Sequence, residues 1–314
     1  MKFTNDTRRP AFAKDPAVVW FGGRYLLYHT TVGGNTGEPV ETGTGIGIAE
    51  SADLERWRVV GDVPPTQPCE QRGICAPGAI VLEGKVHLFY QTYGNGAHDA
   101  ICHAVSEDGV HFEKDPTNPV YAPPDTWCCG RAIDADVCVF SGRLLLYYAT
   151  RDHEMRVQMV GGAAAALSSG FGRGSWQALT DGPLLQPELD WEQTCIEAPA
   201  ALVEGGNVYL FYGGAYNCSP QQIGCAVSED GTVFRRLSGK PFLPCGAPGT
   251  WNSSESGHPF AFRDRDGRCY LFYQGSADGG NTWYLSKEEL DFCGGVPQLK
   301  TKGGSGVGSS TDLA

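Results

Sequence analysis

The sequence of 314 residues predicts an all-β protein: a five-bladed β-propeller in which each blade is a four-stranded antiparallel sheet. The first observation is composition, because 43 glycines, 20 prolines and only 19% charged residues suit many short strands joined by tight turns. The second is a sequence pattern that recurs roughly every sixty residues. The third is that each repeat contains enough strand-like segments for one blade.

The repeat consists of an apolar strand, a turn containing glycine, and a second strand that ends in aromatic residues. In each unit a glycine precedes a tyrosine by six positions, and the pairs are Gly22/Tyr28, Gly84/Tyr90, Gly142/Tyr148, Gly206/Tyr212 and Gly267/Tyr273. An apolar run, a polar turn such as SEDG and another aromatic residue follow, which is the pattern of a β-hairpin. A solenoid is the alternative for any repeat, but solenoid repeats are usually shorter or helical. We therefore expect one propeller over residues 1–297 and a disordered, Gly/Ser-rich tail over residues 298–314.

Charge and cysteine usage exclude several classes of protein. The formal net charge is -12 and no run of Lys or Arg exceeds a pair, which argues against nucleic-acid binding. No apolar stretch approaches the roughly 20 residues of a membrane span, and the N-terminal MKFTNDTRRP lacks the apolar segment of a signal peptide. Several of the twelve cysteines lie in apolar strands and no CxxC pair occurs, so we expect mostly free thiols and a cytoplasmic protein.

The starts of the innermost strands should converge at one rim of the central channel. These segments read KDPAV, CAPGAI, AIDADV, IEAPAA and SGHPFA, and we interpret as equivalent the residues Asp15, Ala76, Asp134, Glu197 and His258. A carboxylate directly before an apolar strand can simply cap a turn, which is the alternative for each acid taken alone. Three carboxylates that converge are what acid–base chemistry on a glycosidic bond requires.

These three acids carry a family resemblance. Asp15 in DPAVVW, Asp134 in AIDADV and Glu197 in IEAPAALV resemble the signature acids of glycoside hydrolase family 43, over roughly residues 10–290. The resemblance implies a five-bladed propeller that acts mainly on arabinose- and xylose-containing glycans. The related fructosidases of family 32 usually carry RDP and ECP motifs at the second and third positions, where this chain has AIDAD and IEAP.

The second acid departs from the family pattern. Asp134 is followed by Ala135 where the family commonly has proline. Alternate residues of a strand face the same side, so Asp136 remains an alternative to Asp134.

The resemblance also implies roles for these residues. Asp15 would be the general base that activates a water, Glu197 the general acid, and Asp134 the neighbour that raises the pKa of Glu197 and orients it. Family 43 inverts the anomeric centre, so we expect the carboxyls of Asp15 and Glu197 about 6.5–9.5 Å apart, whereas a retaining enzyme would bring them to about 5–5.5 Å. His258 resembles an axial histidine that holds a calcium ion or a water, with a core histidine as the alternative. One imidazole does not specify calcium, and no cofactor is otherwise expected.

Further residues are candidates for substrate binding. Tryptophans precede three of the rim residues by six or seven positions and either stack on sugar rings or close a blade as core residues. Charged residues near the rim either hydrogen-bond sugar hydroxyls or are solvated loop charges. The candidates are Trp127, Trp191, Trp251, Arg131, Arg151, His153 and Glu255.

The function that we expect is hydrolysis of terminal arabinofuranosyl or xylosyl residues from oligosaccharides, by a protein whose oligomeric state the sequence leaves open. The alternatives are a fructosidase or another furanosidase or anhydrogalactosidase on the same propeller, and a sugar-binding propeller without catalysis.

Overall fold

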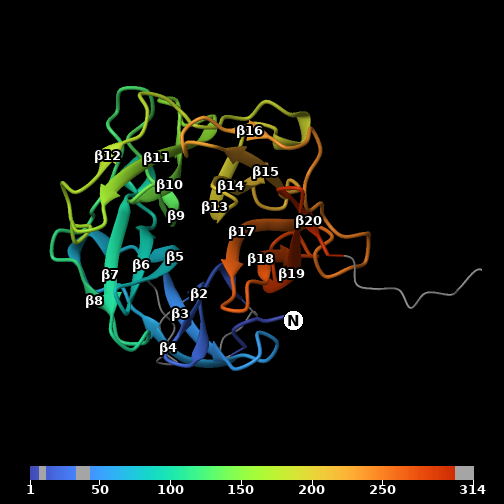
Figure 1. The fold of residues 1–314 in the computed structure, drawn as a ribbon, viewed down its shortest axis with the longest axis horizontal. Coiled ribbons are helices and arrows are strands. Elements are labelled where there is room, and N and C mark those ends of the chain that lie inside the picture. The colour runs from blue at the N-terminus through green and yellow to red at the C-terminus, as the bar shows by residue number, and fades with distance from the viewer. Residues whose placement is uncertain (7–11, 33–42, 301–314) are drawn as a thin grey trace, which may run out of the picture.

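The computed structural model describes residues 1–6, 12–32 and 43–300. Within these residues five four-stranded antiparallel sheets surround a central axis, as Figure 1 shows. The prediction of an all-β, five-bladed propeller is therefore confirmed. The described helices are short 3₁₀ turns, and no helix in this part of the chain is long and apolar enough to cross a bilayer.

Each blade uses four strands in chain order, with the first strand innermost. The first two blades are formed by β1 (Lys14–Phe21), β2 (Arg24–Val32), β3 (Thr44–Ser51), β4 (Arg58–Val63), β5 (Ile74–Leu82), β6 (Lys85–Thr92), β7 (Ile101–Ser106) and β8 (Glu113–Lys114). The other three are formed by β9 (Ile133–Phe140), β10 (Arg143–Arg151), β11 (Gln158–Ala166), β12 (Gln177–Ala178), β13 (Ile196–Glu204), β14 (Asn207–Gly214), β15 (Gln222–Ser228), β16 (Arg235–Arg236), β17 (Glu255–Arg263), β18 (Cys269–Ser276), β19 (Tyr284–Cys293) and β20 (Val296–Leu299).

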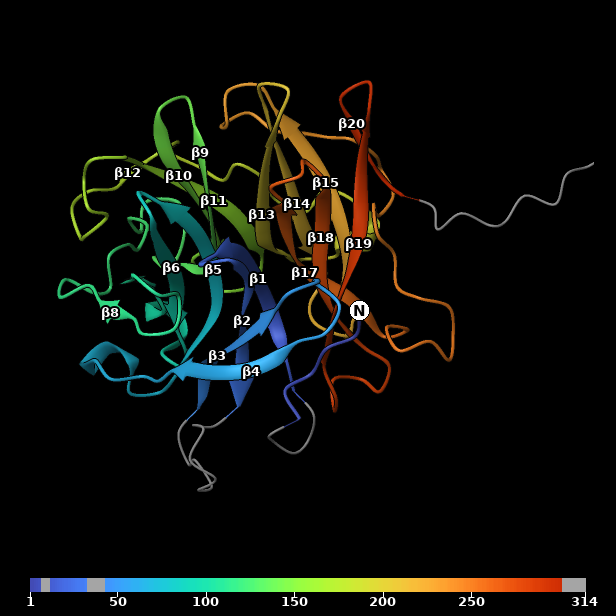
Figure 2. The same cartoon turned by 60° about the horizontal axis from the view of Figure 1, so that its bottom comes forward.

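The ring closes between the last blade and the first. The inner strands β1, β5, β9, β13 and β17 each contact the next, and β17 contacts β1. Near the N-terminus, Phe3 exchanges two backbone hydrogen bonds of 2.8 and 2.7 Å with Leu285 of β19. In Figure 2 the N-terminal end accordingly lies beside the last blade. The first residues of the chain therefore help to fasten the last blade.

Apolar clusters fill the spaces between neighbouring blades, and the repeated aromatic residue belongs to them. Tyr90, Tyr148, Tyr212 and Tyr273 are buried at equivalent places on the second strands. In blade 1 the equivalent residue is His29, so the pair Gly22/Tyr28 is wrong by one position.

The strand register explains this shift. β1 and β2 are joined by a two-residue turn in which Gly23, rather than Gly22, matches the repeat glycine. His29 then lies opposite Gly47, where a Cβ atom would come within 2.6 Å of the imidazole. Tyr148 meets Gly161 in the same way. In these two blades a glycine on the third strand thus makes room for an aromatic ring on the second strand.

The end of the propeller lies slightly beyond the predicted boundary. β20 extends to Leu299, two residues past position 297. Most of the expected tail, residues 301–314, lies outside the described residues.

Candidate active site

All five inner strands begin with the same backbone irregularity. One residue near each strand start has a positive φ, between 42° and 54°, and the sheet register shifts there in each blade. These bulge residues are Asp15, Ala76, Asp134, Ala198 and His258. Non-glycine residues seldom adopt this conformation, yet two of the five are alanines. The bulge is therefore a property of the propeller and not of the acids alone.

This geometry corrects the equivalence that we assumed for Glu197. The bulge residue of blade 4 is Ala198, and Glu197 lies one position earlier. Glu197 pairs with Gly213 just as Lys14 pairs with Thr30 in blade 1. The error arises because the sequence shows a run of acids before apolar residues but does not show where the backbone bulges.

Side chains of the preceding blade accept hydrogen bonds from four of the bulge amides. Each acceptor is a threonine or a glutamine that lies on the second strand or directly before the third. The bonds run from Asp15 N to Gln274 Oε1 (3.0 Å), Ala76 N to Thr30 Oγ1 (2.8 Å), Asp134 N to Gln91 Oε1 (2.7 Å) and His258 N to Gln221 Oε1 (3.2 Å). A bulge removes an amide from the strand ladder, and these contacts satisfy it again.

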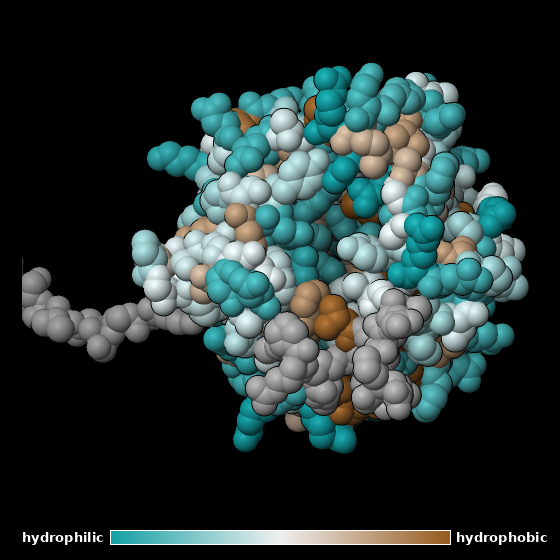
Figure 3. Space-filling model, turned by 180° about the vertical axis from the view of Figure 1, so that it is seen from behind, coloured by the Kyte–Doolittle hydropathy of each residue, from teal (hydrophilic) through white to brown (hydrophobic). Residues whose placement is uncertain are grey.

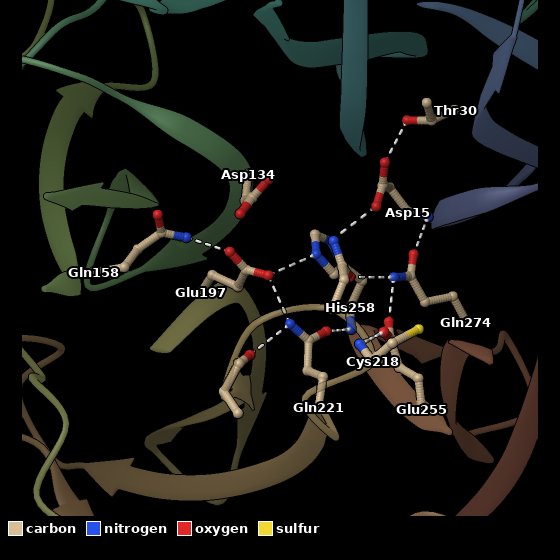
Figure 4. A network of polar contacts seen from close by, with 12 residues as sticks. Asp15, Thr30, Asp134, Gln158, Glu197, Cys218, Gln221, Glu255, His258 and Gln274 are labelled. Carbon is tan, nitrogen blue, oxygen red and sulfur yellow. Dashed lines mark hydrogen bonds and ion pairs between the residues drawn. The ribbon is translucent and has the colours of Figure 1, made fainter. Parts of the chain in front are cut away.

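Four of the predicted residues, Asp15, Asp134, Glu197 and His258, converge on the axis and form what we call the axial cluster (Figure 4). His258 lies between the base and acid candidates: Nδ1 is 2.8 Å from Asp15 Oδ1 and Nε2 is 3.1 Å from Glu197 Oε1. Asp134, Glu197 and His258 present side-chain atoms that lie within 4.8 Å of one another. All four side chains are largely buried, and they come from four different blades.

The electrostatics of the cluster are dominated by the imidazole. Burial alone lowers the pKa of His258, but the neighbouring carboxylates outweigh it and hold this pKa well above its usual value. Burial opposes ionisation of Asp15 and Glu197, but His258, together with the charge of Lys14 and the side-chain hydrogen bonds of each carboxylate, outweighs burial and lowers both pKa values. His258 is therefore an imidazolium between two carboxylates.

Asp134 behaves differently. Burial, together with the charges of Glu197 and Asp15, raises the pKa of Asp134 to about 7, although His258 and Arg131 oppose the shift. The repulsion between the neighbouring carboxylates therefore raises the pKa of Asp134, whereas the pKa of Glu197 is lowered. The reason is that Glu197, unlike Asp134, is hydrogen-bonded to the imidazolium. The family resemblance implies the opposite direction for Glu197.

Asp136 lies outside the cluster contacts. Its Oδ2 accepts a hydrogen bond from Ala201 N at 2.7 Å, on the inner strand of the next blade. Burial raises its pKa to about 7. Asp134 therefore has the geometry of a partner for Glu197, while Asp136 joins two blades.

The residues around the axis do not fit a calcium ion. Both nitrogens of His258 are already within hydrogen-bond distance of carboxylates, Asp15 on one side and Glu197 on the other. The cavity between the five strand starts measures about 20 Å³, which is room for one water. Calcium takes about 6–8 oxygen ligands, so we derive no role for it.

Glu255 occupies a different place from the one that we expected. Its side chain is completely buried rather than at the solvated rim. It accepts hydrogen bonds from Gln274 Nε2 (2.6 Å) and Cys218 N (2.7 Å), and Gln274 in turn accepts the bond from Asp15 N. Glu255 therefore supports the backbone of Asp15 and is not available to a sugar in this structure.

The tryptophans pack against the blades. Trp191 stacks on Tyr212 with ring centroids 6.1 Å apart, and Trp251 lies 5.6 Å from Tyr273. Trp127 is half-buried in the loop before β9. These contacts agree with the alternative in which Trp191 and Trp251 complete a core, and a sugar-facing role for the three tryptophans stays a prediction.

The three remaining candidates lie at different depths. Arg131 is mostly buried, with Nη2 3.7 Å from Asp99 Oδ2, and its charge acts on Asp134. Arg151 donates from Nε to Gln158 Oε1 at 2.6 Å and lies over the ring of Tyr216. His153 is exposed. Substrate contacts of all three stay predictions.

The sequence reasoning missed the polar residues that hold the cluster in place. They are Thr30, Gln91, Gln158, Gln221 and Gln274. The signal was present in part, since Gln91 and Gln274 follow the repeat tyrosine in two FYQ segments. Gln158 and Gln221 have no such signal because they reach the site from the third strand or just before it.

The face from which the inner strands begin is hollowed at its centre. Figure 3 shows this hollow surrounded by predominantly hydrophilic residues. The axial cluster lies at the starts of the inner strands and therefore on the side of this hollow.

Comparisons with known proteins identify the family of this chain. The family described as "Glycosyl hydrolases family 43" matches residues 9–290. No curated protein matches significantly. Among solved structures, a thermostable family-43 glycoside hydrolase is 21% identical with a TM-score of 0.75, covering 95% of this chain and 96% of that one.

Two other structures share the fold. An endo-1,4-β-xylanase from Bacteroides thetaiotaomicron is 20% identical with a TM-score of 0.72, covering 92% of this chain and 94% of that one. An exo-1,5-α-L-arabinanase from a bovine ruminal metagenomic library is 19% identical with a TM-score of 0.67, covering 95% and 99%. At these identities the structures show the fold, whereas the family match covers most of the sequence. The chain therefore belongs to glycosyl hydrolase family 43 and is a glycoside hydrolase.

Proposed function

We propose that this enzyme removes terminal arabinofuranosyl or xylosyl residues from oligosaccharides with inversion of the anomeric centre. Asp15 is the general base, Glu197 the general acid, and Asp134 the neighbouring carboxyl that carries a proton near neutral pH. The similarity in fold to a xylanase and an arabinanase supports this substrate class.

The observation that supports inversion is the imidazole between the two carboxylates. His258 contacts Asp15 through one nitrogen and Glu197 through the other. An imidazole ring and two ordinary hydrogen bonds separate the facing oxygens by roughly 7 Å. That spacing falls within the range of about 6.5–9.5 Å for inverting enzymes, which leaves room for a water, and not near the roughly 5–5.5 Å of retaining ones.

The proposed reaction balances as a single displacement. Asp15 takes a proton from water while the water oxygen bonds to the anomeric carbon. The glycosidic C–O bond breaks, and Glu197, after it has taken the proton held by Asp134, gives that proton to the departing oxygen. Asp134 has a pKa raised to about 7 and lies next to Glu197, so a proton is held close to the acid at neutral pH.

We also propose a reducing, cytoplasmic environment and short soluble substrates. All twelve cysteines are free, and seven are buried, which suits thiols that act as small apolar residues. Titration of the unfolded protein with a thiol reagent, without reductant, should therefore find twelve thiols.

The experiment that tests the function is hydrolysis of a panel of nitrophenyl glycosides. The panel holds the α-L-arabinofuranoside, β-D-xyloside, β-D-fructofuranoside and β-D-galactofuranoside. We expect release from one of the first two, with the inverted anomer as the first product seen by proton NMR. Release only from the fructofuranoside, with retention, would favour the fructosidase alternative, and sugar binding without turnover would favour a binding propeller.

A further inference from the structure

Two glutamines from two blades hold the carboxylate of Glu197. Gln158 Nε2 donates to Glu197 Oε2, and Gln221 Nε2 donates to Oε1 at 2.6 Å. Both glutamine side chains are completely buried. Figure 4 shows them on two sides of Glu197, with His258 approaching from a third.

The orientation of both amides follows from their other contacts. The Oε1 atom of Gln158 accepts a hydrogen bond from Arg151 Nε at 2.6 Å, so its Nε2 must face Glu197. The Oε1 atom of Gln221 accepts from His258 N at 3.2 Å, and its Nε2 also donates to Ala215 O at 2.9 Å. Neither amide can be reversed without placing oxygen against oxygen.

These glutamines occupy corresponding places in blades 3 and 4. Each lies at the start of the third strand or directly before it. In blades 1, 2 and 5 the polar residue near the bulge is on the second strand: Thr30, Gln91 and Gln274. At the same register blades 3 and 4 have the small residues Ala149 and Gly213. Blades 3 and 4 therefore leave space near Glu197, and a glutamine at the start of the third strand or directly before it fills that space.

The glycines next to Gln221 are matched to its side chain. A Cβ atom on Gly257 would lie 1.9 Å from Gln221 Oε1, and one on Gly213 would lie 3.0 Å from Gln221 Cδ. Gly257 is not among the residues with positive φ, so alanine fits its backbone. An alanine there would displace the Gln221 amide, and its Cβ atom would also lie 2.9 Å from Glu255 Oε1, while every atom of Gln221 and Glu197 stays chemically intact.

We propose that Gln158 and Gln221 are positioning residues that fix the rotation of the Glu197 carboxylate and aim it at the leaving oxygen. The proposal rests on Glu197 being the general acid. A carboxylate with one oxygen bound to each amide cannot rotate freely, and each bond to a charged group is strong. Through His258 N, Gln221 also ties the acid to the bulge of the next blade.

The test uses Gln158→Met and Gln221→Met, which keep the approximate length of the side chain and remove the donor. Gln222→Met is the matched control, because the neighbouring Gln222 instead accepts a bond from Cys245 N. The first measurement is a ¹³C NMR titration of the Glu197 carboxyl, assigned by its loss in Glu197→Gln. Each amide favours the ionised carboxylate, so its removal should move the midpoint up by about one pH unit, while Gln222→Met leaves it unchanged.

The second measurement is kinetic, with p-nitrophenyl α-L-arabinofuranoside and its 2,4-dinitrophenyl counterpart. We expect kcat on the first to fall about 10- to 100-fold with little change in KM. The descending alkaline limb of the pH profile should move to higher pH, because the acid must be protonated to act. The dinitrophenyl substrate needs little proton donation, so its kcat should fall much less.

Gly257→Ala provides an independent test in case the methionine variants fail to fold. It should reproduce the shift in the NMR midpoint and the dependence on leaving group, in a protein with the circular dichroism of the wild type. The role of the two glutamines would be overturned if folded Gln158→Met and Gln221→Met kept the wild-type midpoints and rates. If Glu197→Ala were inactive in the same experiment, the assignment of Glu197 as the acid would still stand. Full activity of Glu197→Ala would overturn the proposed acid as well.

Discussion

Blade 1 supplies the proposed base and blade 4 the proposed acid. Each inner strand carries an equivalent bulge near its start, but the two acids occupy different positions relative to that bulge. Asp15 is itself the bulge residue of β1, with a φ of 51°. Glu197 precedes the bulge residue Ala198 on β13 and pairs regularly with Gly213. The longer side chain thus starts one position earlier, and both carboxylates still meet His258.

The supports of the two acids also differ. Asp15 accepts a bond from the hydroxyl of Thr30, on its own blade, and its backbone is held by Gln274 of blade 5. Glu197 accepts from two amides, of which Gln158 belongs to blade 3 and Gln221 to blade 4. One repeated bulge can therefore present acids in unlike environments when the side chains on neighbouring strands differ.

The largest expected effect separates the two acids by their chemistry. Asp15→Asn and Glu197→Gln should each lower kcat on a nitrophenyl glycoside by about 10²- to 10⁴-fold. On a dinitrophenyl glycoside the loss should persist for Asp15→Asn, because water still needs a base, but shrink for Glu197→Gln. Steady-state kinetics of both variants on both substrates checks this, and equal losses on the two substrates would contradict the assigned roles.

A second prediction tests whether the position on the bulge matters. The double variant Glu197→Ala/Ala198→Glu moves the carboxylate onto the bulge residue, as in blade 1. Ala198 borders the axial cavity of about 20 Å³, which cannot hold a glutamate. We expect activity no higher than that of Glu197→Ala and a loss of about 1–3 kcal/mol in the free energy of unfolding. Recovery of activity would show that the two positions are interchangeable.

A third prediction concerns the hydrogen bond from the Thr30 hydroxyl to the proposed base Asp15. Burial raises the pKa of Asp15, and the Thr30 hydroxyl helps to lower it, after the larger effects of His258 and Lys14. The same hydroxyl accepts a hydrogen bond from Ala76 N. A base must be ionised, so activity is lost as pH falls through this pKa. Thr30→Val should move the acidic limb of the kcat/KM profile to higher pH and lower kcat about tenfold. Thr30→Ser keeps the hydroxyl and should retain the wild-type limb, and an unmoved limb in Thr30→Val would refute the role of this bond.

The smallest expected effect on activity concerns Asp136. Burial raises its pKa to about 7 in the folded protein, so the folded state retains a proton that the unfolded chain loses above about pH 4. Stability from this group is complete below that pH and is lost as pH rises toward 7. Asp136→Asn should reduce this loss by roughly 1–3 kcal/mol in urea unfolding between pH 4 and 8, with nearly unchanged kcat. A large fall in kcat would instead identify Asp136 as the partner of Glu197.

Much of the fold could be predicted because the sequence repeats. The glycine turns, the aromatic strand ends and the apolar inner strands are local patterns, and five copies of them specify a closed ring of five sheets. The repeats did not reveal where the strand register shifts by one residue. Gly22/Tyr28 and Glu197 were both misplaced by one position, since neither a two-glycine turn nor a bulge changes the composition of the segment.

The amino-acid sequence was sufficient to predict that Asp15, Asp134, Glu197 and His258 lie near one another, because all four are at or next to the starts of inner strands in a repeated unit. It did not reveal that His258 bridges Asp15 and Glu197, that Glu255 is buried, or that Gln158 and Gln221 hold the acid. These contacts join residues 24 to 243 positions apart, and those of His258 with Asp15 and of Gln158 with Glu197 cross from one blade to another. Their distances depend on the twist and packing of whole sheets, which no local pattern contains.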